Sequence, residues 1–152
     1  MPMVARMLTL WLLLGLTASY TQANIPDEVD PQLRQRLMQA VSMADSFEDR
    51  FDAEVWLLDM STRMARFVPD ETERLRLLRL VHREARLAGL KPDLVLAVIH
   101  VESLFDRYAL SRAGGEGIMQ VMPFWKNELG RSDDNLIDLA TNLRYGCSII
   151  KH

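Results

Sequence analysis

The chain has 152 residues, of which 49% are hydrophobic and 26% charged, and its formal net charge at pH 7 is −3. These values are typical of one globular domain of ordinary composition that is long enough to bury a core. The small negative charge argues against the basic surface that nucleic-acid binding needs, so we expect no nucleic acid as a partner.

The first 23 residues have the layout of a secretory signal peptide. Arg6 is followed by an apolar run from Met7 to Leu16 and then by small and polar residues that end at Ala23. The run is about ten residues long, short of the ~20 that a membrane-spanning helix needs, so cleavage is favoured over an uncleaved anchor. We therefore expect a signal peptide over 1–23, with export to the periplasm or cell envelope.

The next part, residues 24–68, is predicted to be an N-terminal helical segment. One helix is expected from about Pro31 to Met43, and a second from Ser46 toward Arg66. Apolar residues recur at helical spacing here and further on, and no run after the signal peptide alternates as a strand does. The mature chain is therefore predicted to be all-α.

Two more helices carry signals at their ends. Asp70 and Glu73 have the spacing of a capping box, and Gly89 is typical of the residue that follows a helix. Pro92 then suits the first position of another helix. These signals predict helices on both sides of Gly89.

The helix that begins at Pro92 carries Glu102 among apolar residues. Val98 and Ile99 lie within about 60° of it on a helix of 3.6 residues per turn. An unpaired ionised carboxylate in such surroundings costs several kcal/mol, so a buried group of this kind usually keeps its proton near neutral pH. The pattern predicts a buried general acid. The alternative is a surface glutamate near the helix end, or one paired with Arg107 or Arg112.

The stretch "ALSRAGGEGIMQVMP", residues 109–123, is too irregular for a helix. It holds Ser111 and Gln120 together with three glycines, which permit backbone turns that other residues resist. Such a loop can bring polar groups back over the end of the preceding helix.

Three short motifs in this region resemble, in order, those of the lytic transglycosylase family, whose catalytic domain is related to goose-type lysozyme. They are Glu102-Ser103, "ALSRAG" at 109–114 and "GIMQVMP" at 117–123. The resemblance is continuous from Leu90 to Pro123 and looser over about 142–150. It implies a lysozyme-like helical fold.

The resemblance also implies an activity: cleavage of the β-1,4 bond between N-acetylmuramic acid and N-acetylglucosamine in peptidoglycan, leaving a 1,6-anhydromuramyl end. Glu102 matches the sole catalytic acid. Ser111 and Gln120 match positions that contact the sugar, and Met122 matches one that lines the glycan groove. Ser103 matches the serine after the catalytic glutamate, where substrate contact and a helix-end hydroxyl both stay open as roles.

One carboxyl is enough for the chemistry that the resemblance implies. Glu102 would first protonate the glycosidic oxygen and then take the proton of the muramic C6 hydroxyl, whose oxygen closes on C1. No metal or cofactor is expected, since the three histidines lack ligand spacing and Cys147 is interpreted as an apolar helix residue. The expected partners are the glycan strands of peptidoglycan. A monomer, open to peripheral association with the cell envelope, is expected.

The resemblance departs from the family at two loop positions and at the C-terminal end. Arg112 stands where proline is frequent, and Glu116 where a small or apolar residue is usual. A later aromatic-asparagine motif is missing, and we interpret residues 69–152 as an incomplete catalytic domain. In such a domain we expect Glu102 to be more exposed to water than in a complete one. A hydrolytic lysozyme and a non-catalytic glycan-binding fragment remain as alternatives.

Overall fold

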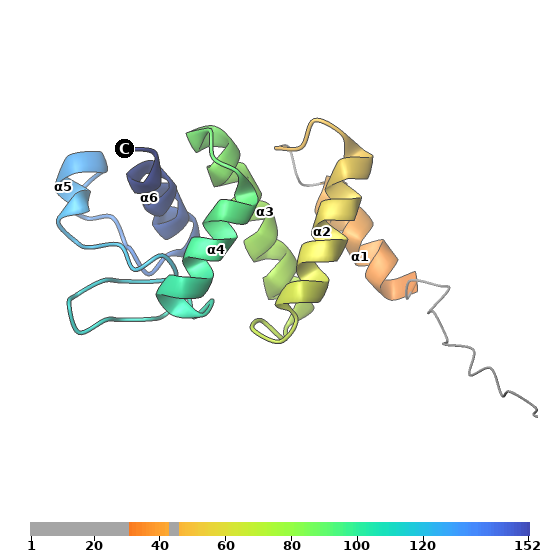
Figure 1. Cartoon of the computed structure of the whole chain (residues 1–152), viewed down its shortest axis with the longest axis horizontal. Coiled ribbons are helices and arrows are strands. Elements are labelled where there is room, and N and C mark those ends of the chain that lie inside the picture. The colour runs from red at the N-terminus through yellow and green to blue at the C-terminus, as the bar shows by residue number, and fades with distance from the viewer. Residues whose placement is uncertain (1–30, 43–45) are drawn as a thin grey trace, which may run out of the picture.

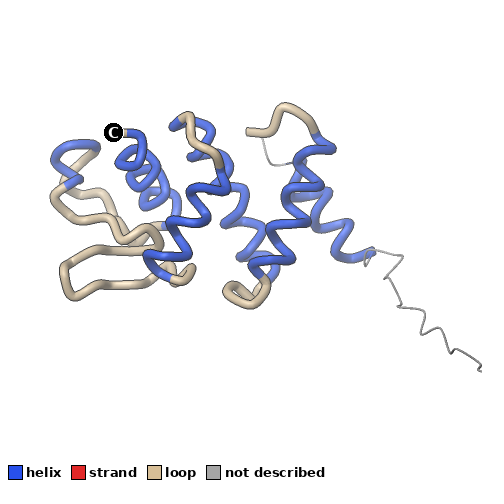
Figure 2. Tube along the Cα trace, viewed as in Figure 1, coloured by secondary structure: helices blue, strands red, loops and turns tan. Residues whose placement is uncertain are grey.

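The computed structural model describes residues 31–42 and 46–152, so the predicted signal peptide lies outside the described residues. Within these ranges the fold is all-α, as predicted, and no strand occurs (Figures 1 and 2). The helices are α1 (Pro31–Ser42), α2 (Arg50–Met64), α3 (Glu71–Ala88), α4 (Pro92–Ser103), α5 (Trp125–Leu129) and α6 (Leu139–Lys151).

Helix α3 is the centre of the molecule and contacts α1, α2, α4 and α6. Figure 1 shows α1 and α2 at one end and α5 and α6 at the other, with α3 and α4 between them. The inner residues Leu78, Val81 and Ala85 of α3 are fully buried. Burying an aliphatic side chain contributes about 1.5–3 kcal/mol, so packing around α3 holds the helices together.

The ends of α3 and the start of α4 confirm the sequence signals. The Asp70 carboxylate accepts a hydrogen bond from the Glu73 N–H at 2.6 Å. Gly89 adopts a left-handed conformation with φ 73°, and its N–H donates to the carbonyl groups of Ala85 and Arg86. Helix α4 begins at Pro92. The local chemistry of these residues thus sets where α3 begins and ends and where α4 starts.

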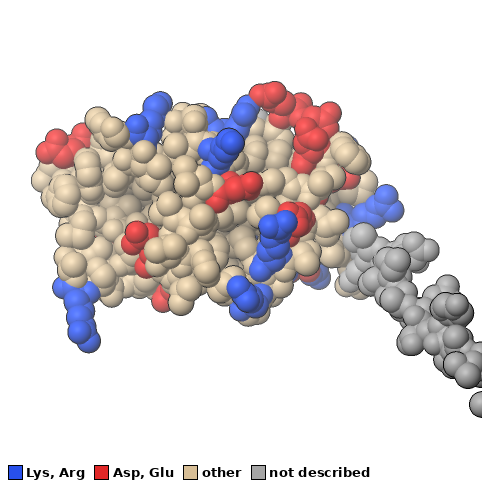
Figure 3. Space-filling model, viewed as in Figure 1, with Lys and Arg blue, Asp and Glu red and all other residues tan. Residues whose placement is uncertain are grey.

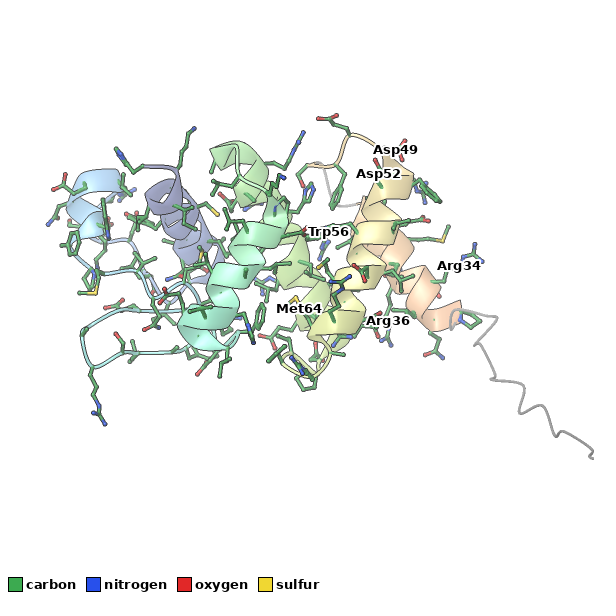
Figure 4. The ribbon with its side chains drawn as sticks, in the orientation of Figure 1. Arg34, Arg36, Asp49, Asp52, Trp56 and Met64 are labelled. Atoms are coloured by element: carbon green, nitrogen blue, oxygen red, sulfur yellow. The ribbon has the colours of Figure 1, made fainter. Side chains whose placement is uncertain are left out.

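The predicted start of α2 at Ser46 was wrong, because Asp49 caps the helix and its first residue is Arg50 (Figure 4). Asp49 Oδ1 accepts from the N–H groups of Phe51 and Asp52 at 2.6 and 3.1 Å. Residues 46–49 therefore form the loop that leads into α2.

This loop closes on α3 through His82, which is 8% exposed. The Ser46 hydroxyl lies 2.7 Å from His82 Nδ1, and the Phe47 ring stacks on the imidazole at a centroid distance of 3.4 Å. Burial, aided by the positive charge of Arg86 and opposed by Asp93, lowers the pKa of His82 to about 4. The imidazole is therefore neutral in the folded protein at neutral pH.

We predict that acid weakens the fold through His82. The pKa in the folded state lies below the unfolded value of 6.5, so the unfolded chain takes up the proton first and stability falls as the pH drops from about 6.5 toward 4. The expected loss between pH 6.5 and 5 is about 1–2 kcal/mol. Urea unfolding at both pH values measures it. His82→Phe should remove this slope, and an equal slope in both proteins would contradict the assignment to His82.

Candidate active site

Glu102 lies in the last turn of α4, and its side chain is exposed. The prediction of a buried carboxyl was therefore wrong. Helix α4 packs against α3 with Val95 and Ile99, which are fully buried, whereas Val101 is 81% exposed. The apolar residues near Glu102 thus point mostly into the contact with α3 and do not cover its carboxylate.

No hydrogen bond or ion pair joins the Glu102 carboxylate to another side chain within 31–42 and 46–152. Arg107, one of its candidate partners, instead approaches Glu73 of α3, with Nη1 3.9 Å from Oε1. Asp106, the nearest carboxyl in sequence, accepts a hydrogen bond from the Tyr108 N–H at 2.9 Å. Glu102 is therefore an accessible carboxylate at the end of a helix.

Two left-handed residues reverse the chain immediately after this helix. Leu104 has φ 51° and Phe105 φ 68°, a conformation that costs side-chain-bearing residues about 1–2 kcal/mol each. The Phe105 ring packs on Phe67 at 5.3 Å between centroids and beside His100 at 5.9 Å. This aromatic packing holds the turn in place.

Ser103 joins the end of α4 to the loop. Its hydroxyl lies 2.7 Å from the Ile118 carbonyl oxygen and 3.2 Å from that of Ile99. The structure thus shows the helix-end role that the sequence left open. Through this contact the loop lies against the turn that carries Glu102.

The loop itself is folded by backbone pairing. Glu116 forms isolated antiparallel bridges with both Leu110 and Val121. The Ser111 hydroxyl accepts from the Gly115 N–H at 2.8 Å, and the Ser111 N–H donates to the Gly115 carbonyl oxygen at 2.9 Å. Figure 1 shows this segment extending from α4 toward α5 and α6.

Gln120 is held in a left-handed conformation with φ 51°. Its Nε2 donates to the carbonyl oxygens of Ala109 at 3.1 Å and Gly117 at 2.9 Å. The amide nitrogen is therefore used inside the loop, and only Oε1 is left to accept a bond from a ligand.

The structure brings Ser111 and Gln120 together. A Cβ built on Gly115 would lie 3.0 Å from Ser111 Oγ and 3.1 Å from Gln120 Oε1, so the two oxygens flank this glycine. Met122 is half-buried, and its Cε would lie 3.9 Å from a Cβ on Gly114. Sequence-predicted sites on the loop therefore gather around its glycines.

Sequence reasoning missed Asn142, a buried polar residue of α6. It is 1% exposed and hydrogen-bonds three backbone groups near the loop. The available signal was an asparagine next to the apolar stripe that Leu139 and Leu143 form on that helix, because a polar group in such a place needs partners.

Hollows occur elsewhere on the described chain, and Glu102 does not line the following two. One lies between α3 and α6 and includes Leu87 and Cys147. Burial raises the pKa of the Cys147 thiol to about 12, so it stays protonated and acts as the apolar residue that the sequence indicated. The second includes Trp56 and His82.

Basic and acidic side chains are both present on the face that Figure 3 draws. Figure 3 shows basic and acidic side chains scattered over one face, without a continuous basic stripe. Among the residues that the structure describes, no group of three or more histidine, cysteine or acidic side chains is placed to hold a metal ion. In the same part of the chain, no helix has both the length and the apolar character to span a membrane.

Comparison with known proteins agrees with the motifs. Residues 79–152 match the family described as Transglycosylase SLT domain. The membrane-bound lytic murein transglycosylases C of Actinobacillus pleuropneumoniae serotypes 5b, 3 and 7 are each 46% identical over 46 residues, which cover 30% of this chain and 13% of the relative. The likeness to these relatives thus concerns a short part of their length. Residues 79–152, just under half of the chain, are thus similar to the transglycosylase SLT domain family.

Proposed function

We propose that this chain is a peptidoglycan lytic transglycosylase that cleaves the bond between N-acetylmuramic acid and N-acetylglucosamine without water and leaves a 1,6-anhydromuramyl end. One observation carries the proposal. An accessible glutamate, Glu102, lies in the last turn of α4, and the next residue, Ser103, is hydrogen-bonded to the loop that holds Ser111 and Gln120. The family match of residues 79–152 and the printed name of the relatives give the substrate class.

In the proposed reaction Glu102 acts twice. Its carboxyl proton passes to the glycosidic oxygen as the bond from C1 to the N-acetylglucosamine oxygen breaks. The carboxylate then takes the proton of the C6 hydroxyl on the same muramic residue, and the C6 oxygen bonds to C1. Glu102 ends in its starting protonation state, and the tethered nucleophile supplies the high effective concentration of an intramolecular reaction.

The exposure of Glu102 is compatible with this role, because a polymeric substrate must reach it. A glycan strand lying over the end of α4 would exclude water from the carboxyl and strengthen its hydrogen bond to the glycosidic oxygen. Asp106 already accepts a bond from the Tyr108 N–H. It is thus less free to serve as the second carboxyl that ordinary glycosidases use, which favours the transglycosylase over the lysozyme.

The loop residues would hold the sugar. We assign Ser111 and Gln120 to contacts near the scissile bond, with Gln120 Oε1 accepting from a sugar hydroxyl or amide because its Nε2 is already bonded. Met122 would line the groove. Ser103 would support the loop and lie next to the substrate.

The place of action would be the cell envelope, where peptidoglycan lies. The name of the relatives describes membrane-bound proteins, and the layout of 1–23 predicts export. We assign 24–68 to an N-terminal helical segment and 69–152 to the catalytic domain. This chain would act as a monomer, peripherally associated with the envelope.

Digestion of purified sacculi tests the proposal. The chain should release muropeptides with anhydro ends, which chromatography with mass spectrometry identifies. Reducing ends would instead support the hydrolytic lysozyme. Binding to sacculi with no release would support a glycan-binding module, and either result would overturn the proposed function.

A further inference from the structure

Both the oxygen and the nitrogen of the Asn142 side-chain amide form hydrogen bonds. Its Oδ1 accepts from the Met119 N–H at 2.8 Å, and its Nδ2 donates to the carbonyl oxygens of Glu116 at 2.8 Å and Leu136 at 2.7 Å. A buried amide with this set of partners favours one position of the groups around it, because losing any bond leaves a buried polar group unpaired. Two of the three partners belong to the loop.

Glycines let the loop and α6 approach closely at two points. A Cβ on Gly117 would lie 2.5 Å from Asn142 Nδ2, and one on Gly146 would overlap the Met119 sulfur. Asn142 and Gly146 are four residues apart on α6 and so lie on one face of the helix. Residues 116–119 therefore dock on α6 through both a hydrogen-bonded and a packed contact.

Helix α4 also forms a hydrogen bond to this segment, residues 116–119. The Ser103 hydroxyl, next in sequence to Glu102, lies 2.7 Å from the Ile118 carbonyl oxygen. The peptide groups of 116–119 are thus held between α4 and α6. Gln120 follows directly, in a left-handed conformation that persists only where its surroundings hold it.

We propose that Asn142 is a positioning residue for the proposed reaction. Its buried amide, together with the Ser103 hydroxyl of α4, fixes residues 116–121 beside Glu102 and so places Gln120 over the substrate. The inference rests on the proposed function for its chemical meaning. Asn142 touches no substrate in it and acts through the loop. A displacement of about 1 Å in such a support can lower turnover about a hundredfold.

The test uses Asn142→Leu, which keeps a similar volume and removes the amide. Leu143→Ala is the matched control, since Leu143 is the next residue of α6, fully buried, and forms no hydrogen bond to the loop. Hydrogen exchange of the backbone amides of 116–121, measured relative to those of α3, reports loop position. Sacculus turnover, with kcat and KM separated, reports its consequence.

In Asn142→Leu, exchange in 116–121 should rise at least about tenfold relative to α3. Its kcat should fall about a hundredfold with a smaller change in KM. Leu143→Ala should lower the melting temperature but leave both the exchange of 116–121 relative to α3 and the kcat near the parent values. Equal relative exchange in the two variants would overturn the inference, as would a kcat loss that merely follows the loss of stability.

Two further results keep the test decisive. If Asn142→Leu does not fold, Ser103→Ala is measured in the same way, and unchanged exchange at 116–121 in that variant would overturn the inference. If the parent chain releases no product, the proposed function fails by itself. The positioning claim is then judged by exchange alone, where faster exchange supports it and unchanged exchange overturns it.

Discussion

Replacing Glu102 by Gln is expected to reduce muropeptide release by about 10²–10⁴-fold, the usual contribution of general acid-base catalysis. The amide keeps the size and shape of the side chain but has no acidic proton to transfer. Because Glu102 is exposed, the melting temperature and the binding of sacculi should stay close to those of the parent. Product release, thermal melting and a sacculus pull-down measure the three quantities.

Asp106→Asn is the matched control for this variant. Asp106 is also exposed and lies four residues further on, and an asparagine can keep the hydrogen bond from the Tyr108 N–H. Its activity should stay within a few-fold of the parent. If Glu102→Gln retained activity within tenfold, Glu102 would not be the catalytic acid. A large loss in Asp106→Asn would indicate a second carboxyl and favour the lysozyme mechanism.

Gly117→Ala is expected to give one of the largest losses of stability in the chain. Gly117 has φ 73°, and an added Cβ would lie 2.5 Å from Asn142 Nδ2 and 2.6 Å from the Leu136 carbonyl oxygen. The left-handed backbone costs about 1–2 kcal/mol and the overpacking a further ~1–3 kcal/mol. Urea unfolding should therefore show a loss of about 2–5 kcal/mol.

Gly89→Ala separates these two costs. Gly89 has the same φ of 73°, but nothing lies within 4 Å of an added Cβ. It should lose only the backbone contribution, about 1–2 kcal/mol. Equal losses in the two variants would show that Gly117 does not pack against α6 as described, and would remove the basis for the docked loop.

The sequence predicted most helix ends correctly, because those ends depend on local chemistry. Asp70, Gly89 and Pro92 act through backbone groups within a few residues of themselves. The start of α2 was misplaced because Ser46 and Asp49 are both good capping residues. In the fold the Ser46 hydroxyl bonds His82 instead, a contact between segments that no local pattern reveals.

The exposure of Glu102 could not be predicted from its own helix. A helical pattern shows which residues share a face, but it does not show how far a neighbouring element covers that face. Val95 and Ile99 are buried against α3, whereas Glu102, one turn beyond Val98, lies past the covered part. The depth of a site depends on tertiary packing.

The sequence indicated the loop over 109–123 but not the residues that hold it in place. Three glycines indicated an irregular segment that could return over the end of α4, and Ser103, bonded to Ile118, shows that it does. The bonds from Asn142 to 116–119 join residues more than twenty positions apart. Such pairings become visible only in the folded chain, although the motifs already indicated the family.

The central claim is that Glu102 directs attack by the C6 hydroxyl of the substrate and not by water. Digestion of sacculi in water enriched in heavy oxygen, followed by mass spectrometry of the new muramyl ends, tests it most directly. The transglycosylase mechanism predicts ends that carry no heavy oxygen, because no water enters the product. Heavy oxygen at C1 of the new ends would contradict it and show that the chain is a hydrolase.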